Sequence, residues 1–130
     1  MIVLDASVVL DVVTAVAKGH EIAARIEQTD DEFIAPHVID LEILQALRRQ
    51  LRLELIDKAR AAAAVTLLRD LPLARMSHEP LIARIWDLRN NLTAYDAAYL
   101  ALAELMNAPV WTRDNKFAGA PGHRAQVVVI

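Results

Sequence analysis

Short apolar runs rich in β-branched residues alternate with longer segments of helical periodicity along the whole chain. We expect strands over residues 1–4, 33–35, 72–74, 109–112 and 126–130. We expect helices over residues 8–16, 20–28, 38–53, 55–69, 79–89 and 94–106. Apolar runs without polar alternation are typical of strands that helices cover on both faces. Because strands alternate with helices, the chain is predicted to form a three-layer α/β/α fold around a parallel sheet of four to five short strands, and right-handed crossovers bring the strand ends to one edge.

Local signals set the expected ends and faces of several helices. Ser7 is predicted to cap the first helix, and Lys18-Gly19 to end it. The helix over 94–106 is almost wholly apolar, which predicts that it is buried. In the helix over 38–53, one arc carries Ile43, Leu44, Leu47 and Leu51, and the opposite arc carries Glu42, Gln45, Arg49 and Arg52.

Four acidic residues stand where an expected strand ends or an expected helix begins: Asp5, Glu42, Asp96 and Asp114. In an open α/β sheet, ligands bind in the crevice beyond the carboxyl ends of the strands. Carboxylates gathered there repel one another unless a hard divalent cation that prefers oxygen ligands neutralises them. The pattern therefore predicts a site for Mg²⁺ or Mn²⁺.

Each of these acids also has a structural interpretation. Thr93-x-x-Asp96 has the spacing of a capping box, and Asp114 lies in a segment typical of a turn. Glu42, taken alone, is more typical of a solvated helix residue. Structural roles explain poorly why Asp96 heads an apolar helix and why Asp5 ends a buried strand, because a buried carboxylate needs a partner.

The composition fits one globular domain over residues 1–130. A chain of 130 residues, 55% hydrophobic and 24% charged, can bury one core but not two. The absence of cysteine excludes disulfides and thiolate sites and is compatible with the cytoplasm. The apolar start has no basic region and contains Asp5 and Asp11, so we expect neither a signal peptide nor a membrane span.

The charge balance leaves a nucleic-acid partner open. The net charge is −3, from 17 acidic and 14 basic residues, so the two signs nearly balance once the four candidate ligands are set aside. Candidates for contacts with a phosphate backbone, or for a merely solvated face, are Arg48, Arg49, Arg52, Arg113 and Lys116.

Motifs for other chemistries are missing. The histidines lack paired metal-ligand spacing, and three glycines cannot build a phosphate-binding loop. Four aromatic residues fall at spacings more typical of a core than of a base-stacking platform: Trp86, Tyr95, Tyr99 and Trp111.

Four segments resemble, in order and spacing, PIN-domain ribonucleases, and in particular their VapC toxin branch: 1–7, 36–49, 92–103 and 111–114. The resemblance spans the chain and implies a PIN-like fold. It implies that Asp5, Glu42, Asp96 and Asp114 form an acidic pocket for Mg²⁺ or Mn²⁺. It further implies that the hydroxyls of Ser7 and Thr112 assist nearby, and Asn115 could share the role of Asp114.

The resemblance also implies an activity and partners. We expect a metal-dependent endoribonuclease that acts as the toxin of a toxin–antitoxin pair, forms a homodimer, and is inhibited by an antitoxin segment that enters the acidic groove. One alternative is a degenerate PIN domain that only binds RNA or protein. Another is a phosphatase of the haloacid dehalogenase type, which needs a second Asp where this chain has Ser7. A response-regulator receiver would need a second acid beside Asp5, which is not visible.

Overall fold

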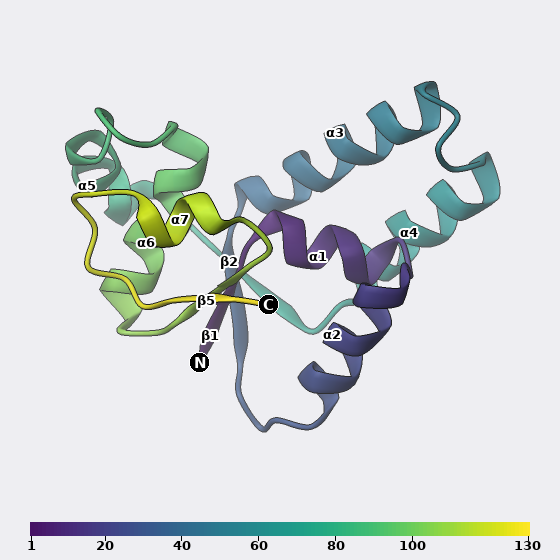
Figure 1. Cartoon of the computed structure of the whole chain (residues 1–130), viewed down its shortest axis with the longest axis horizontal. Helices are drawn as coiled ribbons and strands as arrows, with labels where there is room; N and C mark the ends of the chain where they lie inside the picture. Colours follow the sequence, from purple (N-terminus) through teal and green to yellow (C-terminus); the bar gives the residue numbers. More distant parts are fainter.

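Five short strands form one parallel sheet in the computed structural model, which describes residues 1–130 (Figure 1). The strands are β1 (Ile2–Leu4), β2 (Phe33–Pro36), β3 (Leu73–Met76), β4 (Val110–Thr112) and β5 (Val127–Val129). Their order is β3-β2-β1-β4-β5, and every neighbouring pair is parallel. The predicted parallel sheet is confirmed, and β1 lies at its centre.

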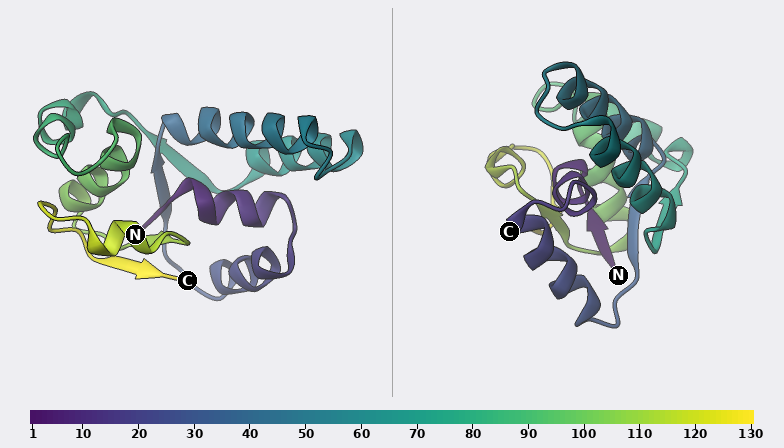
Figure 2. Two further views of the ribbon diagram at one scale, coloured as in Figure 1. Left: turned by 45° about the horizontal axis from the view of Figure 1, so that its top comes forward. Right: turned by 90° about the vertical axis from the view of Figure 1, so that its right-hand side faces the viewer.

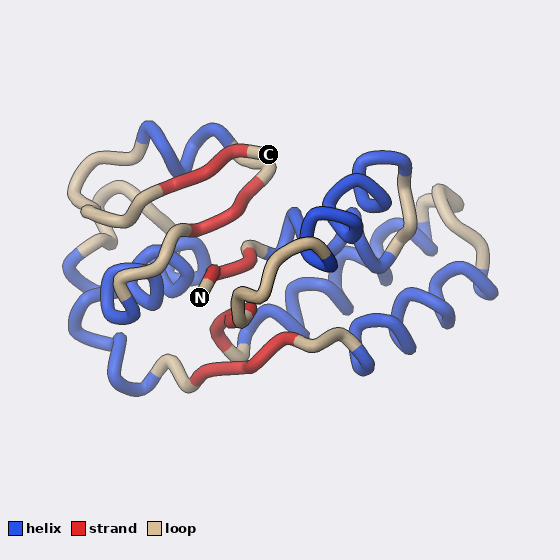
Figure 3. Tube along the Cα trace, turned by 90° about the horizontal axis from the view of Figure 1, so that it is seen from below, coloured by secondary structure: helices blue, strands red, loops and turns tan.

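Helices cover both faces of this sheet. They are α1 (Ala6–Val13), α2 (Ala17–Glu27), α3 (Val38–Arg52), α4 (Lys58–Asp70), α5 (Ile82–Asp87), α6 (Ala94–Met106) and α7 (Asn115–Gly119), with a 3₁₀ turn η1 at Glu79–Leu81. Figures 1 and 2 show α1 to α4 on one side of the strands and α5 and α6 on the other. Seen from below in Figure 3, the strands run between these two groups of helices. None of the helices combines the length and the apolar character that crossing a bilayer requires.

The core is one cluster of 26 buried residues. α6 contributes an unbroken buried run, Ala97–Ala103, which confirms the prediction from its apolar sequence. The alanines of this run let α6 pack closely against β1, β2 and β4. The first turn of α6 is thereby held beside the carboxyl ends of the central strands.

The first two helices differ from the sequence prediction. α1 ends at Val13, and the chain turns through Ala15, whose φ is 53°, before α2 begins at Ala17. Gly19 therefore lies inside α2 and does not end the preceding helix. A Cβ on Gly19 would lie 1.9 Å from the carbonyl oxygen of Asp11, so only glycine permits this close approach of α2 to α1.

Other element ends shift for local reasons. α4 begins at Lys58 because the Asp57 side chain caps it, accepting the backbone N–H of Arg60 at 2.7 Å. The expected helix over 79–89 divides into η1 and the short α5. α7 was not predicted from the sequence, because it is too short to show a helical period.

Candidate active site

Asp5 follows the central strand and is 6% exposed. Its Oδ2 accepts hydrogen bonds from Ser7 Oγ at 2.5 Å and from Thr112 Oγ1 at 2.9 Å. These hydroxyls themselves accept the backbone N–H groups of Arg113 at 3.0 Å and Asp114 at 2.9 Å. Each hydroxyl proton is therefore directed at Asp5 Oδ2, while Oδ1 receives no hydrogen bond from the chain. The prediction that Ser7 caps α1 is wrong, because Asp5 occupies the cap position.

Glu42 lies in the second turn of α3 and is not the solvated residue that its polar stripe indicates. Its Oε1 is buried and has no hydrogen-bond partner, and its Oε2 accepts the Tyr99 hydroxyl at 3.1 Å. Burial raises the pKa of Glu42 to about 7, the Tyr99 hydrogen bond opposes this, and the charges of Asp5 and Asp96 add to it. Leu44, predicted on the buried arc of the same helix, is 41% exposed.

Tyr99 was overlooked as a partner of the acids. It lies one turn after Asp96 on α6, and this spacing on a common helix face was the available signal. The residue is wholly buried, and burial, followed by the charge of Glu42, raises the pKa of its hydroxyl, which therefore stays a proton donor. Trp111 is buried too, whereas Trp86 and Tyr95 are 65% and 62% exposed, against the expectation of a core position.

Asp96 stands in the first turn of α6 and is half-buried. Its backbone N–H donates to Thr93 Oγ1 at 3.1 Å, so the capping interpretation holds for the main chain. Burial raises the pKa of its carboxyl, with further contributions from Asp5 and Asp114, while Lys116 acts in the opposite direction.

Asp114 follows β4 and caps α7, accepting the backbone N–H of Lys116 through Oδ1 at 2.8 Å. Asp114 therefore has a structural role as a helix cap rather than as a turn residue, and this role occupies only one of its two carboxylate oxygens. Asn115, the first residue of α7, is exposed beside it.

Seven acidic residues of the chain are buried or half-buried. Three of these form ion pairs with arginine: Asp11 with Arg113, Asp40 with Arg75, and Glu104 with Arg84. The four that have no basic partner are Asp5, Glu42, Asp96 and Asp114. Withdrawing a carboxylate from water without a counter-charge is costly, so these four residues at one sheet edge are the candidates for binding a cation.

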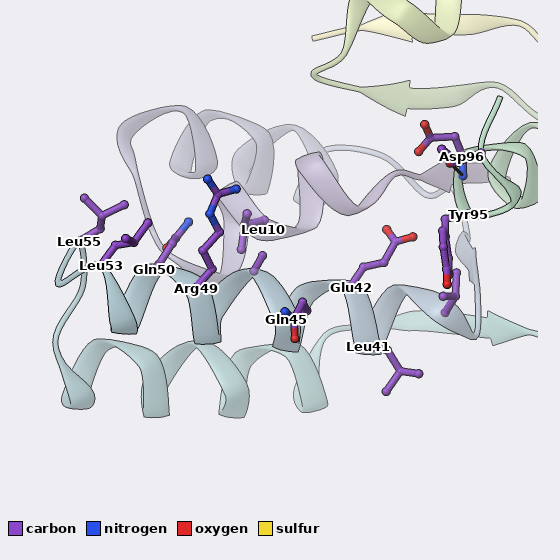
Figure 4. A pocket seen from close by; sticks show the side chains of 13 residues that line it. Leu10, Leu41, Glu42, Gln45, Arg49, Gln50, Leu53, Leu55, Tyr95 and Asp96 are labelled. Carbon is purple, nitrogen blue, oxygen red and sulfur yellow. Dashed lines mark hydrogen bonds between the residues drawn. The ribbon is translucent and has the colours of Figure 1, made fainter. Parts of the chain in front are cut away.

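A cavity of about 920 Å³ opens between α1, α3 and the first turn of α6 (Figure 4). Glu42 and Asp96 lie at one end of it, and Leu53 and Leu55 lie at the other. Arg49 lies between these ends, on the same helix as Glu42. The cavity thus joins an acidic end to a longer, largely apolar groove.

The PIN domain family model matches residues 2–122 of the chain. The chain belongs to the PIN-domain family. Ribonuclease VapC1 of Mycobacterium tuberculosis is 40% identical over 97 residues, which cover 74% of this chain and 73% of that protein. Ribonuclease VapC12 of the same species is 32% identical over 130 residues, covering 100% and 99% of the two chains. These relatives place the chain in the VapC branch.

The same fold occurs among solved structures. A toxin–antitoxin complex from Klebsiella pneumoniae contains a chain that superimposes with a TM-score of 0.67 at 20% identity. The match covers 99% of this chain and 97% of that one, so it confirms the PIN-like fold over nearly the whole length.

The five basic residues that are candidates for RNA contacts in this PIN domain differ in their surroundings. Arg48, Arg49 and Arg52 are exposed on α3, and of these only Arg49 lines the large cavity. Lys116 is exposed beside Asp96 in a second cavity of about 490 Å³. Arg113, in contrast, is tied to Asp11 at 3.0 Å and donates to the backbone oxygen of Ile130. Lys116 therefore supplies free positive charge beside Asp96, and Arg49 supplies it farther along the cavity that Glu42 lines.

The acids of this PIN domain also fit a divalent cation in their chemistry. They offer oxygen donors alone, and Glu42 Oε1 is a buried acceptor that nothing in the chain satisfies. As they stand, no three acidic or histidine side chains are close enough to enclose an ion. The acids nevertheless act on one another, because the charges of Asp5 and Asp96 add to the burial that raises the pKa of Glu42, and those of Asp5 and Asp114 add to the burial that raises the pKa of Asp96.

Proposed function

We propose that this chain is a metal-dependent endoribonuclease that cleaves RNA phosphodiester bonds as the toxin of a VapBC-type toxin–antitoxin pair. One observation carries the proposal. Among the acids that are buried or half-buried, only the four at the carboxyl edge of the sheet have no basic partner. Relatives that are 32% to 40% identical to this chain over the aligned residues are named ribonucleases.

Mg²⁺ or Mn²⁺ is the cofactor that this chemistry favours, because both are hard cations that take carboxylate oxygens. In this proposal Asp5, Asp96 and Asp114 hold the ion, and Glu42 contacts it through water or orients the attacking water. The amide oxygen of Asn115 is a further candidate donor beside Asp114. When bound, the cation stabilises negative charge on the scissile phosphate and makes water more acidic.

The chain's own residues position the acids and move the proton. Ser7 and Thr112 hold Asp5 Oδ2, which leaves Oδ1 available as a ligand atom. Glu42 Oε1 has no partner and the Glu42 side chain lines the cavity, so in this proposal its carboxylate accepts the proton of the attacking water. A pKa of about 7 suits this role, because proton transfer is most efficient when the pKa of the base lies near the working pH.

The partners follow from the same proposal. Arg49 and Lys116 contact the RNA backbone near the acids, and Arg48 and Arg52 extend the positive charge along the exposed face of α3. The proposal includes a homodimer in the cytoplasm and a cognate antitoxin that inserts a segment into the acidic groove. One of the matched structures is itself a toxin–antitoxin complex.

Cleavage of RNA by the purified chain tests the proposal. We expect Mg²⁺- or Mn²⁺-dependent cleavage that EDTA abolishes, and a loss of at least about two orders of magnitude in Asp96→Asn, the scale for losing an electrostatic stabiliser. Asn keeps the backbone N–H that Thr93 caps, so the fold is expected to remain.

Asp70→Asn removes an exposed charge at the end of α4 and serves as the matched control, with parental activity expected. Folded parent protein that cleaves no RNA with either metal would instead support the degenerate, binding-only alternative.

A further inference from the structure

The Tyr99 hydroxyl is the only group of the chain that binds the Glu42 carboxylate. It donates to Oε2 at 3.1 Å, across a separation of 57 residues, from α6 to α3. The Tyr99 ring is wholly buried, so the position of its hydroxyl is fixed by the packing of α6. Glu42, in contrast, has a long side chain that can take several rotamers. The rigid partner therefore sets the orientation of the flexible one.

The other carboxylate oxygen, Oε1, is buried and accepts nothing. Leaving a buried acceptor unpaired is unfavourable, and native proteins rarely tolerate it without a functional reason. Because Tyr99 occupies Oε2, Oε1 is the acceptor atom of Glu42 that stays unpaired, and the Glu42 side chain lines the same cavity as Asp96. Without the Tyr99 hydroxyl, no hydrogen bond from the chain would fix the orientation of the Glu42 carboxylate.

We propose that Tyr99 is a positioning residue, whose hydroxyl directs Glu42 Oε1 toward the water that attacks the phosphodiester. This inference rests on the proposed ribonuclease function and adds to it a residue that touches neither RNA nor metal. The Tyr99 hydroxyl keeps Glu42 Oε1 in one orientation. Loss of this hydroxyl therefore slows the chemical step and leaves substrate binding unchanged.

Kinetics of Tyr99→Phe test this proposal. Positioned proton transfer contributes roughly 10²- to 10⁴-fold to a rate, and we expect the variant to lose about ten- to a hundredfold in kcat with KM within about twofold of the parent. In a Glu42→Gln background the same substitution is expected to cost nothing further, because Tyr99 acts only through Glu42. Effects that multiply in the double variant would overturn the proposal, as would parental kcat in Tyr99→Phe.

A purely structural role is distinguished by a matched control. Thr14→Val also deletes a buried hydroxyl, which donates to the Leu10 carbonyl at 2.6 Å at the far end of α1. We expect it to lower stability without changing kcat. Tyr99→Met, which lacks the donor and packs adaptably, serves as a second variant if Tyr99→Phe does not fold.

A measurement without substrate or metal separates this proposal from the proposed function. In protein with ¹³C-labelled glutamate carboxyls, the Glu42 resonance is assigned by its absence in Glu42→Gln. We expect the chemical shift of this resonance to change in Tyr99→Phe and to stay the same in Thr14→Val. An unchanged chemical shift in Tyr99→Phe overturns the proposal. If the folded parent cleaves no RNA, the proposed ribonuclease function is wrong. The change in the Glu42 chemical shift still tests, independently of cleavage, whether the Tyr99 hydroxyl orients the Glu42 carboxylate.

Discussion

At the scale of single residues, Glu42 links the stability of the metal-free protein to pH. Its pKa is raised from 4.5 to about 7 by burial, so the folded state binds this proton more tightly than the unfolded state does. The stability that the proton contributes is fully present below about pH 4.5 and is lost as pH rises through about 7. Asp96 acts in the same direction.

We therefore expect Glu42→Gln, which cannot ionise, to gain thermal stability relative to the parent between about pH 5 and about pH 8 in EDTA. Thermal melts of both proteins across this range measure the difference in Tm. If the difference in Tm between the two proteins does not change with pH, the pKa of Glu42 is not raised in the folded state.

Arg49 is the second single residue for which we predict an effect, as a contact to the RNA backbone. It lines the cavity that Glu42 and Asp96 share, and no acid of the chain pairs with it. We expect Arg49→Ala to raise KM for RNA and to reduce the slope of log affinity against log salt by about 1, the signature of one lost phosphate contact. Arg60→Ala removes an exposed charge on α4 and should change neither quantity. If the slope of log affinity against log salt is unchanged in Arg49→Ala, Arg49 does not contact the RNA backbone.

At the scale of elements, the packing of α1 on α2 depends on one missing methyl group. In Gly19→Ala the new Cβ meets the backbone of Asp11, which cannot move aside without shifting α1. We expect a loss of about 1–3 kcal/mol or more in the free energy of unfolding, measured by urea denaturation. Gly119→Ala is the control: nothing lies within 4 Å of that Cβ, so the substitution in α7 should be neutral or stabilising. Equal stabilities of the two variants would contradict this account.

The elements also show which parts of the molecule the sequence can predict. The strands, the buried α6 and the places of Asp5 and Asp96 follow from local patterns of apolar and acidic residues. The surroundings of Glu42 do not, because its partner Tyr99 lies 57 residues away and only the packed fold brings them together. The role of Gly19 was misassigned for the same reason, since a helix-ending glycine and a close-packed one look alike until the neighbouring helix is placed.

At the scale of the whole molecule, the four unpaired acids predict that stability depends on metal. We expect Mn²⁺ or Mg²⁺ to raise the Tm, with a gain of about 2.7 kcal/mol when free metal is a hundredfold above its dissociation constant, and EDTA to reverse it. Asp96→Asn removes one repelling charge, so it should melt higher than the parent without metal and gain less from added metal. A lower metal-free Tm with an unchanged response to metal would assign Asp96 to helix capping alone.

The hydroxyl bridges to Asp5 tie the first strand to the segment after β4. Thr112 reaches Asp5 across 107 residues of sequence, and Ser7 meets the backbone of Arg113 across 106. A nascent chain on the ribosome therefore lacks both the bridges and the fourth acid until synthesis has passed Asp114. The proposed nuclease site therefore assembles only after β4 and the residues that follow it have been made, however early β1 is synthesised.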